Sequence, residues 1–175
     1  MFNYLLLFLF SFSFHMLNAQ MNVQAIPSKA NATVSVEGNL SDGAKMQDLS
    51  WAWNSQNACF VATQIHKFTG NHVLFETELP RRAEMFITVI PKNKNDNFSI
   101  YAYSKASRAI VPDLARCVSC EAEFKWDRKK RGKTQDHTRT VSLRAIGNPY
   151  HVVIGVVGAE GLTEGDFTLE IRLEG

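Results

Sequence analysis

Short segments with a two-residue hydrophobic period constrain this chain more than any other feature of its sequence. The clearest segment spans residues 167–173, whose odd-numbered positions are apolar and whose even-numbered positions are polar. Residues 98–103 and 140–145 show the same alternation. Successive side chains of a β-strand point to opposite faces, so each segment is expected to form a strand with one buried face.

Further apolar runs of strand length are bounded by Gly, Pro and Asn residues, which favour turns. These runs are residues 58–63, 72–79, 85–90 and 151–157, of which the last is apolar on both faces, as expected of a central strand. No window of eleven or more residues keeps helical spacing, and residues 109–115 are expected to form at most one helical turn, interrupted by Pro112. Seven or eight short strands predict an all-β fold, an antiparallel β-sandwich of jelly-roll-like type.

The N-terminus differs from the rest of the chain. Residues 1–19 contain no charged side chain and include an apolar run over residues 4–14. Such a run is too short for a membrane-spanning helix, which needs about 20 residues, but it suits a secretory signal. Ala19 is a small residue of the kind that precedes signal cleavage. We therefore expect a signal peptide over residues 1–19 and a mature chain that begins at Gln20, has no transmembrane segment and is secreted, periplasmic or cell-envelope-associated.

The remaining residues divide into a lead and a domain. Residues 20–50 are polar and rich in turn-forming residues, so they are expected to form a flexible lead with at most one short edge strand at residues 33–36. Residues 51–175 hold the strand-like segments and are expected to form a single β-sandwich domain.

Charge and motifs argue against several classes of protein. The 19 Lys and Arg residues against 17 Asp and Glu residues leave a net charge of +2, too small a surplus to indicate a nucleic-acid partner. The sequence contains no P-loop, dinucleotide fingerprint, G-x-S-x-G or HExxH motif. Glu76 and Glu78 are interpreted as solvated side chains on one strand face, and His151 as a residue at the edge of the core. We therefore expect a protein that is not an enzyme.

The C-terminal two-thirds of the chain carries a recognisable order of segments. A strand at residues 72–79 is followed by Pro-Arg-Arg, a second strand, an Asx-rich loop and a third strand, and the chain closes with PYHVVI at 149–154 and GDFTLEI at 165–171. This order resembles the bacterial pre-peptidase C-terminal domain family over about residues 71–174. The resemblance implies a secreted jelly-roll-like sandwich that acts as an accessory or binding module beside a peptidase.

Some members of that family bind calcium through an acidic pattern at the start of a strand. The matching stretch here is residues 95–101, in which Asp96 is the only carboxylate and Ser99 stands where a second acid would fall. Calcium sites use six to eight oxygen ligands, usually from several carboxylates. We therefore expect weak calcium binding at Asp96, or none, and no other cofactor.

Three cysteines, Cys59, Cys117 and Cys120, occur in a chain with an expected export signal, where a disulfide is the default. A Cys117–Cys120 bond closes a small ring worth about 2 kcal/mol in the chain-entropy model, whereas a bond from Cys59 closes about 60 residues and is worth about 4 kcal/mol. The short separation of Cys117 and Cys120 along the chain favours the first pairing, whereas the larger stabilisation favours the second. We prefer Cys117–Cys120, and both pairings stay open. A zinc site is less favoured, because zinc ribbons have two CxxC pairs. Its ligands would be the three thiolates plus one histidine: His66, His72 or His137.

Two segments are candidates for ligand binding. The densest charge feature is the sequence KWDRKKRGK at residues 125–133, a cationic run that fits an anionic glycan or lipid headgroup, or is a solvated loop. Its candidate ligand-binding residues are Trp126, Arg128, Lys129, Lys130 and Arg131. Trp51 and Trp53 lie on one side of an extended segment, where they stack sugar rings or, as the favoured alternative, cap the core.

These features predict a secreted, non-catalytic accessory or binding module that contacts an extracellular glycan, a secreted protein or an envelope surface. The alternatives are a small secreted hydrolase with a non-standard site and a purely structural envelope protein. A hydrolase needs convergent polar groups in one pocket. A binding module needs an exposed patch on a sheet face, a rim or a loop.

Overall fold

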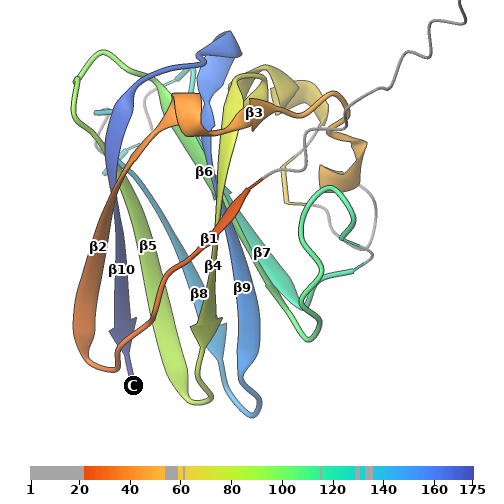
Figure 1. The fold of residues 1–175 in the computed structure, drawn as a ribbon, viewed down its shortest axis with the longest axis vertical. Helices are drawn as coiled ribbons and strands as arrows, with labels where there is room; N and C mark the ends of the chain where they lie inside the picture. The colour runs from red at the N-terminus through yellow and green to blue at the C-terminus, as the bar shows by residue number, and fades with distance from the viewer. Residues whose placement is uncertain (1–21, 54–58, 61, 115, 129–130, 133–135) are drawn as a thin grey trace, which may run out of the picture.

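Two β-sheets packed face to face form most of the described chain (Figure 1). The structure is a computed structural model that describes residues 22–53, 59–60, 62–114, 116–128, 131–132 and 136–175. Its strands are β1 (Val23–Ala25), β2 (Ala32–Asn39), β3 (Ala44–Lys45), β4 (Asn71–Leu79), β5 (Ala83–Pro91), β6 (Phe98–Lys105), β7 (Ser119–Glu123), β8 (Arg139–Ala145), β9 (Tyr150–Gly158) and β10 (Asp166–Glu174). Sheet A has the order β1–β4–β9–β6–β7, with β3 also paired to β4, and sheet B has the order β2–β10–β5–β8. The predicted all-β sandwich is confirmed.

The interior between the two sheets is filled by alternate residues of the facing strands. In β5 the side chains of Met85, Ile87 and Val89 are buried, and the residues between them are partly exposed. On the neighbouring strand β10, Leu169 and Ile171 lie opposite Val89 and Ile87 and are buried too. Because the side chains of a strand alternate between faces, this pattern follows directly from the two-residue period of the sequence.

The outer face of sheet A is buried as well, which explains why β9 is apolar on both faces. Tyr101 and Tyr103 of β6 point away from sheet B and are covered by the chain between β3 and β4. Trp51 packs against both tyrosine rings, with ring centroids 5.5 and 5.6 Å apart. We call this layer the outer cluster; its buried members are Leu49, Trp51, Ala52, Phe60, Phe68, Leu74, Tyr101, Tyr103, Val111, Leu114, Phe124, Val153 and Val157.

A glycine in the central strand makes room for this layer. Gly155 of β9 pairs with Tyr101 on one side and with Leu74 on the other. A Cβ atom at Gly155 would lie 2.0 Å from Cζ of Tyr101, far inside van der Waals contact. The tyrosine ring therefore lies directly over the glycine backbone, and any larger residue would displace it.

The prediction for residues 20–50 is wrong in one respect. These residues are not a lead beside the domain, because β1 pairs with β4, β3 pairs with β4 and β2 pairs with β10. Their apolar side chains are few but well placed: Ile26 and Leu40 are buried in the core between the sheets. The described part of the chain consequently has ten strands where the sequence indicated seven or eight.

The described residues of the segment 58–63, which are residues 59, 60, 62 and 63, do not form the predicted strand. Cys59 and Phe60 lie in a bend, and the 3-10 helix η3 (Ala62–Phe68) follows. The apolar character of the segment has a different cause, since the Phe60 and Phe68 rings stack at 3.8 Å in the outer cluster.

The other described helices are the short η1 (Leu40–Asp42), η2 (Ser50–Ala52) and η4 (Ala159–Gly161). Within the described residues, no helix has the length and apolar character needed to cross a membrane. The predicted signal at residues 1–19 lies outside those residues.

Candidate functional site

Strand register brings a set of ionisable side chains together at one end of sheet A. Glu78 of β4 lies opposite His151 of β9, and His151 lies opposite Lys105 of β6. Glu76 is two residues from Glu78 and therefore shares its face. This is the outer face of sheet A, and these residues lie beyond the end of the outer cluster that covers the rest of it.

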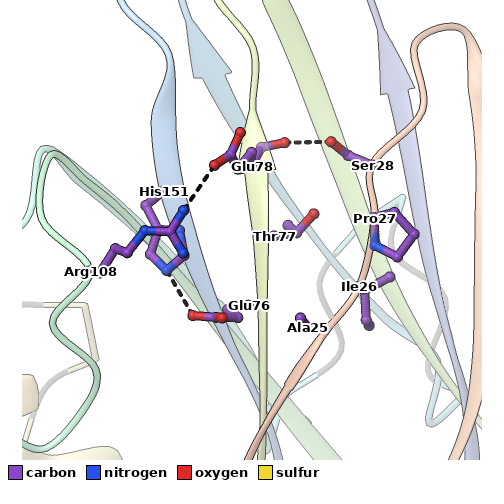
Figure 2. Close-up of a pocket in the computed structure, with 9 residues that line it drawn as sticks. All are labelled: Ala25, Ile26, Pro27, Ser28, Glu76, Thr77, Glu78, Arg108 and His151. Atoms are coloured by element: carbon purple, nitrogen blue, oxygen red, sulfur yellow. Dashed lines mark hydrogen bonds and ion pairs between the residues drawn. The ribbon is translucent and has the colours of Figure 1, made fainter.

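Three of these side chains, Glu76, Glu78 and His151, line a pocket of about 430 Å³ that opens on the molecular surface (Figure 2). We call it the Glu–His pocket; its lining residues are Ala25, Ile26, Pro27, Ser28, Glu76, Thr77, Glu78, Arg108 and His151. The chain that follows β1 forms one wall and is tied to β4 at two points. The Ile26 amide donates to the Glu76 carbonyl at 2.8 Å, and the Ser28 hydroxyl donates to the Glu78 carbonyl at 2.6 Å. The wall is thus fixed by the backbone of the strand that supplies the carboxylates.

His151 is the most buried ionisable group of the pocket lining. Its Nε2 atom lies 3.0 Å from Oε2 of Glu76, and its side chain is 9% exposed. Because a carboxylate can only accept, Nε2 carries the proton and donates it. Burial, and next the charge of Lys105, lower the pKa of His151, so the ring is neutral at pH 7. Its Nδ1 atom is buried and has no hydrogen-bond partner among the described residues. The ring therefore retains one acceptor that no described residue uses.

Two cations accompany the carboxylates, and the structure holds them differently. Lys105 is 1% exposed and donates from Nζ to the Ser107 carbonyl at 3.2 Å. Burial, assisted by the charge of Arg108 and opposed by Glu76, lowers the pKa of Lys105 to about 8. Arg108 donates to Glu78 at 3.4 Å, and their side chains are 76% and 70% exposed. Exposed pairs of this kind contribute about 0–1 kcal/mol, so Arg108 is easily exchanged for another cation.

The chemistry available in the pocket is ion pairing and hydrogen bonding. Among the described residues, the hydrogen-bond partner of the His151 side chain is the Glu76 carboxylate, so no hydroxyl or thiol of these residues is placed for activation by its ring. The Ser28 hydroxyl is already donated to a backbone carbonyl. Among the described residues, no group of three or more His, Cys, Asp or Glu side chains is arranged to hold a metal ion.

Sugar stacking, the less favoured of the two roles left open for Trp51, does not agree with the structure. Trp51 is 7% exposed and packs edge-on against Phe60 and Tyr101, so neither face of the indole is open to a ligand. Trp51 instead caps the core, which was the favoured alternative, because it is buried in the outer cluster. Trp53 is partly buried against the same cluster.

We call the cationic run at residues 125–133 the basic segment. It begins at the opposite end of sheet A from the Glu–His pocket, because it follows the end of β7 that pairs with Ile100 of β6. Arg128 and Arg131 are exposed, and Lys129 and Lys130 lie outside the described residues. The Trp126 indole donates to Glu123 at 3.0 Å, and its ring centroid is 4.3 Å from that of Phe124. Trp126 is thus partly engaged by its own neighbours.

The base of the basic segment is anchored by a buried lysine. Lys67 of η3 lies 3.0 Å from Asp127 and 3.2 Å from Glu160 of η4. The Lys67 side chain is 4% exposed, whereas both carboxylates are on the surface. The arginines that follow Asp127 therefore project from a tethered point.

Asp96, the predicted calcium ligand, lies in the turn before β6. Its Oδ1 accepts from the Asn93 amide at 2.9 Å, and its backbone amide donates to the Asn93 carbonyl at 3.1 Å. The turn is thus closed by local hydrogen bonds.

We predict that millimolar calcium leaves the melting temperature of the mature protein unchanged, because one carboxylate supplies too little of the charge that Ca²⁺ needs. Thermal unfolding with calcium and with a chelator measures this. A rise of several degrees that the chelator reverses would contradict the prediction.

The three cysteines lie close together on the outer face of sheet A, next to the outer cluster. No disulfide joins any two of them in the structure, which describes all three. The predicted disulfide, in either pairing, therefore stays a prediction. His72, one of the histidines named for a zinc site, is already bound through both ring nitrogens to Phe68 and Tyr101.

The sequence showed the pocket residues but not their proximity. It placed Glu76 and Glu78 on one face and His151 at the start of a strand, and each was interpreted alone. The missing information was the register between β4, β9 and β6, which are far apart in the chain. Lys105 and Arg108 gave no local signal.

No family model matches the chain, and no curated protein matches its sequence. Its structure is similar to the pre-peptidase C-terminal domain of a collagenase from Bacillus anthracis, at 9% identity over 89% of this chain and 98% of that one, with a TM-score of 0.40. A periplasmic inhibitor of g-type lysozyme from Aeromonas hydrophila is similar at 11% identity over 86% and 96%, with a TM-score of 0.38. A surface-associated copper-binding protein from Methylomicrobium album is similar at 10% identity over 86% of this chain and 97% of that one, with a TM-score of 0.44.

The resemblance to pre-peptidase C-terminal domains that the sequence indicated is thus confirmed as a structural similarity. All three TM-scores are below 0.5, and none of these proteins defines what this chain binds.

Proposed function

We propose that this chain is an exported, non-catalytic β-sandwich module that binds a partner through the Glu–His pocket. The observation that supports this most is the combination of a fixed wall with ionisable groups that the protein only partly satisfies. The wall is held by Ile26 and Ser28, and Nδ1 of His151 is buried without a partner among the described residues. Buried polar groups are normally hydrogen-bonded, so an unsatisfied one that belongs to a pocket lining favours a binding role.

The ligand that fits the pocket is a cationic group, such as a lysine or arginine side chain of a secreted or envelope protein. Glu76 and Glu78 supply two carboxylates on one face. The neutral His151 adds no opposing charge, and Lys105 is held on the Ser107 carbonyl. A guanidinium pairs with carboxylates in a bidentate geometry, so a partner's arginine can replace the long and exposed Arg108 contact at small cost.

Removal of the two carboxylates tests this proposal. We expect Glu76→Gln with Glu78→Gln to weaken the binding of a hexalysine peptide to the mature protein at least ten-fold, since each charged contact is worth about 1.5–3 kcal/mol. Isothermal titration calorimetry measures the affinity. Asp113→Asn with Glu164→Gln is the matched control, because both residues are exposed and the net charge changes equally. Equal weakening in the control would mean that the probe responds only to total charge.

An anionic glycan at the basic segment is the second candidate, favoured by the exposure of Arg128 and Arg131 beside the tethered Asp127. Its probe is a heparin oligosaccharide. Contacts held by screened charge weaken as salt rises from about 0.05 to 0.5 M, because the Debye length shrinks about three-fold. Heparin binding that is lost in Arg128→Ser with Arg131→Ser, together with no hexalysine binding, would assign recognition to this segment and overturn the pocket proposal.

A further inference from the structure

Three thiols from two distant parts of the sequence form one cluster on the outer face of sheet A. Cys120 of β7 lies opposite Tyr103 of β6. Cys59 reaches the same place from the bend before η3, where its amide donates to the Ala52 carbonyl at 2.9 Å. Cys117 precedes β7, and all three side chains are half-buried against the outer cluster.

Hydrogen bonds make Cys120 the centre of this cluster. The thiols of Cys59 and Cys117 each form a side-chain hydrogen bond with Cys120, and the Tyr103 hydroxyl forms one with Cys59. The charge that acts on Cys120 is that of Glu121, the next residue along β7, which is exposed. A sulfur surrounded by S–H donors is stabilised as a thiolate, because a hydrogen bond to the charged form favours that form.

We propose that Cys120 is a thiol modification site that reacts with low-molecular-weight disulfides, that Cys59 activates it as a hydrogen-bond donor, and that Cys117 resolves the product.

The ionisation of the three thiols agrees with this division. The hydrogen bond from Cys59 is the largest influence on Cys120 and lowers its pKa, although burial and Glu121 act in the opposite direction. Burial raises the pKa of Cys59 strongly, and it raises the pKa of Cys117 to about 11. Cys120 is therefore the only one of the three thiols whose pKa is lowered, and it is the one we expect to lose its proton first as the pH rises.

The reaction proceeds in two balanced steps. The Cys120 thiolate attacks one sulfur of a disulfide RSSR, the S–S bond of the reagent breaks, and RS⁻ leaves and takes up a proton. The Cys117 thiolate, formed by loss of a proton to solvent, then attacks Sγ of Cys120 and releases the second RS⁻. Two cysteine thiols are oxidised to a Cys117–Cys120 disulfide and the reagent is reduced to two thiols, while Cys59 stays reduced.

The test measures the rate at which the reduced mature protein reacts with 2,2′-dipyridyl disulfide between pH 5 and pH 9. We expect one thiol to react first, with an apparent pKa below the ordinary cysteine value of about 8.5. Cys59→Ala should slow this phase about three- to ten-fold at pH 7, because the thiolate fraction of Cys120 falls. Cys59→Ser keeps an O–H donor and should retain most of the rate and the pH profile.

Cys117→Ala should leave the mixed disulfide on Cys120, where peptide mass analysis locates it. A fast phase that maps to Cys59 or Cys117 would overturn the proposal. So would an unchanged rate and pH profile in Cys59→Ala. If Cys59→Ser is as slow as Cys59→Ala, Cys59 acts by packing and its role as a donor is wrong. None of these outcomes depends on the Glu–His pocket.

Discussion

Gly155→Ala is expected to destabilise the protein by about 3 kcal/mol or more, at the upper end of the cost of overpacking a core. The added methyl group would lie 2.0 Å from Cζ of Tyr101 and 2.4 Å from its hydroxyl oxygen. The ring cannot move aside easily, because it packs against Trp51 and Phe68 and its hydroxyl bonds to His72. Urea unfolding of the variant and the parent protein measures the difference.

Gly147→Ala is the control for this substitution. Gly147 lies between β8 and β9, and a Cβ atom there meets nothing within 4 Å. Its replacement should change the free energy of unfolding by less than about 0.5 kcal/mol. Similar losses in both variants would mean that the Tyr101 contact does not set the cost at Gly155, since the entropy of the unfolded chain favours alanine at both positions.

Acidification is expected to destabilise the fold through His72, well before the carboxylates titrate. The imidazole is buried; Nε2 donates to the Phe68 carbonyl at 3.0 Å and Nδ1 accepts from the Tyr101 hydroxyl at 3.2 Å. Burial lowers the pKa of His72 to about 4, against about 6.5 in the unfolded chain. The unfolded state therefore binds the proton first, and stability falls as the pH drops from about 6.5 to about 4. The full loss in the free energy of unfolding is about 3 kcal/mol, and about 2 kcal/mol of this loss is reached by pH 4.5.

Urea unfolding at pH 7 and pH 4.5 measures this loss. His72→Gln removes the titrating ring and should reduce the difference between the two pH values to the contributions of the other histidines. His66→Gln, an exposed substitution in the neighbouring 3-10 helix η3, should leave the parent difference in place. A His72→Gln variant that loses as much stability as the parent would show that another group is responsible.

Local periodicity was sufficient to predict the sandwich, because alternation along a strand directly reports which face is buried. The strands β6, β8 and β10 were visible in this way, and β4, β5 and β9 were expected from apolar runs of strand length. In residues 20–50 only an edge strand at residues 33–36 was expected, and these residues lie in β2. The strands β1 and β3 were not expected, because they are two or three residues long and are stabilised by their partners. The outer cluster was missed for a related reason. Phe68 lies in the 3-10 helix η3 and Phe60 in the bend before it, and neither segment has a regular hydrophobic period that would reveal a buried face.

The candidate sites depend on long-range pairing, which the sequence does not encode locally. Glu78, His151 and Lys105 become neighbours only through the register of three strands. Cys59 likewise approaches Cys120 only because the chain before η3 folds over sheet A. For Trp51 the sequence left two roles open, a platform for sugar stacking and a cap on the core, of which the core cap was favoured. Tertiary packing decides for the core cap.

The central claim, that the Glu–His pocket is the binding site, is tested most directly by amide chemical-shift mapping of the ¹⁵N-labelled mature protein during titration with hexalysine. The account predicts saturable shifts that are largest at residues 76–78, at Arg108 and at His151, with no comparable change at residues 125–132. Saturable shifts confined to residues 125–132, or none at residues 76–78 and His151, would contradict it.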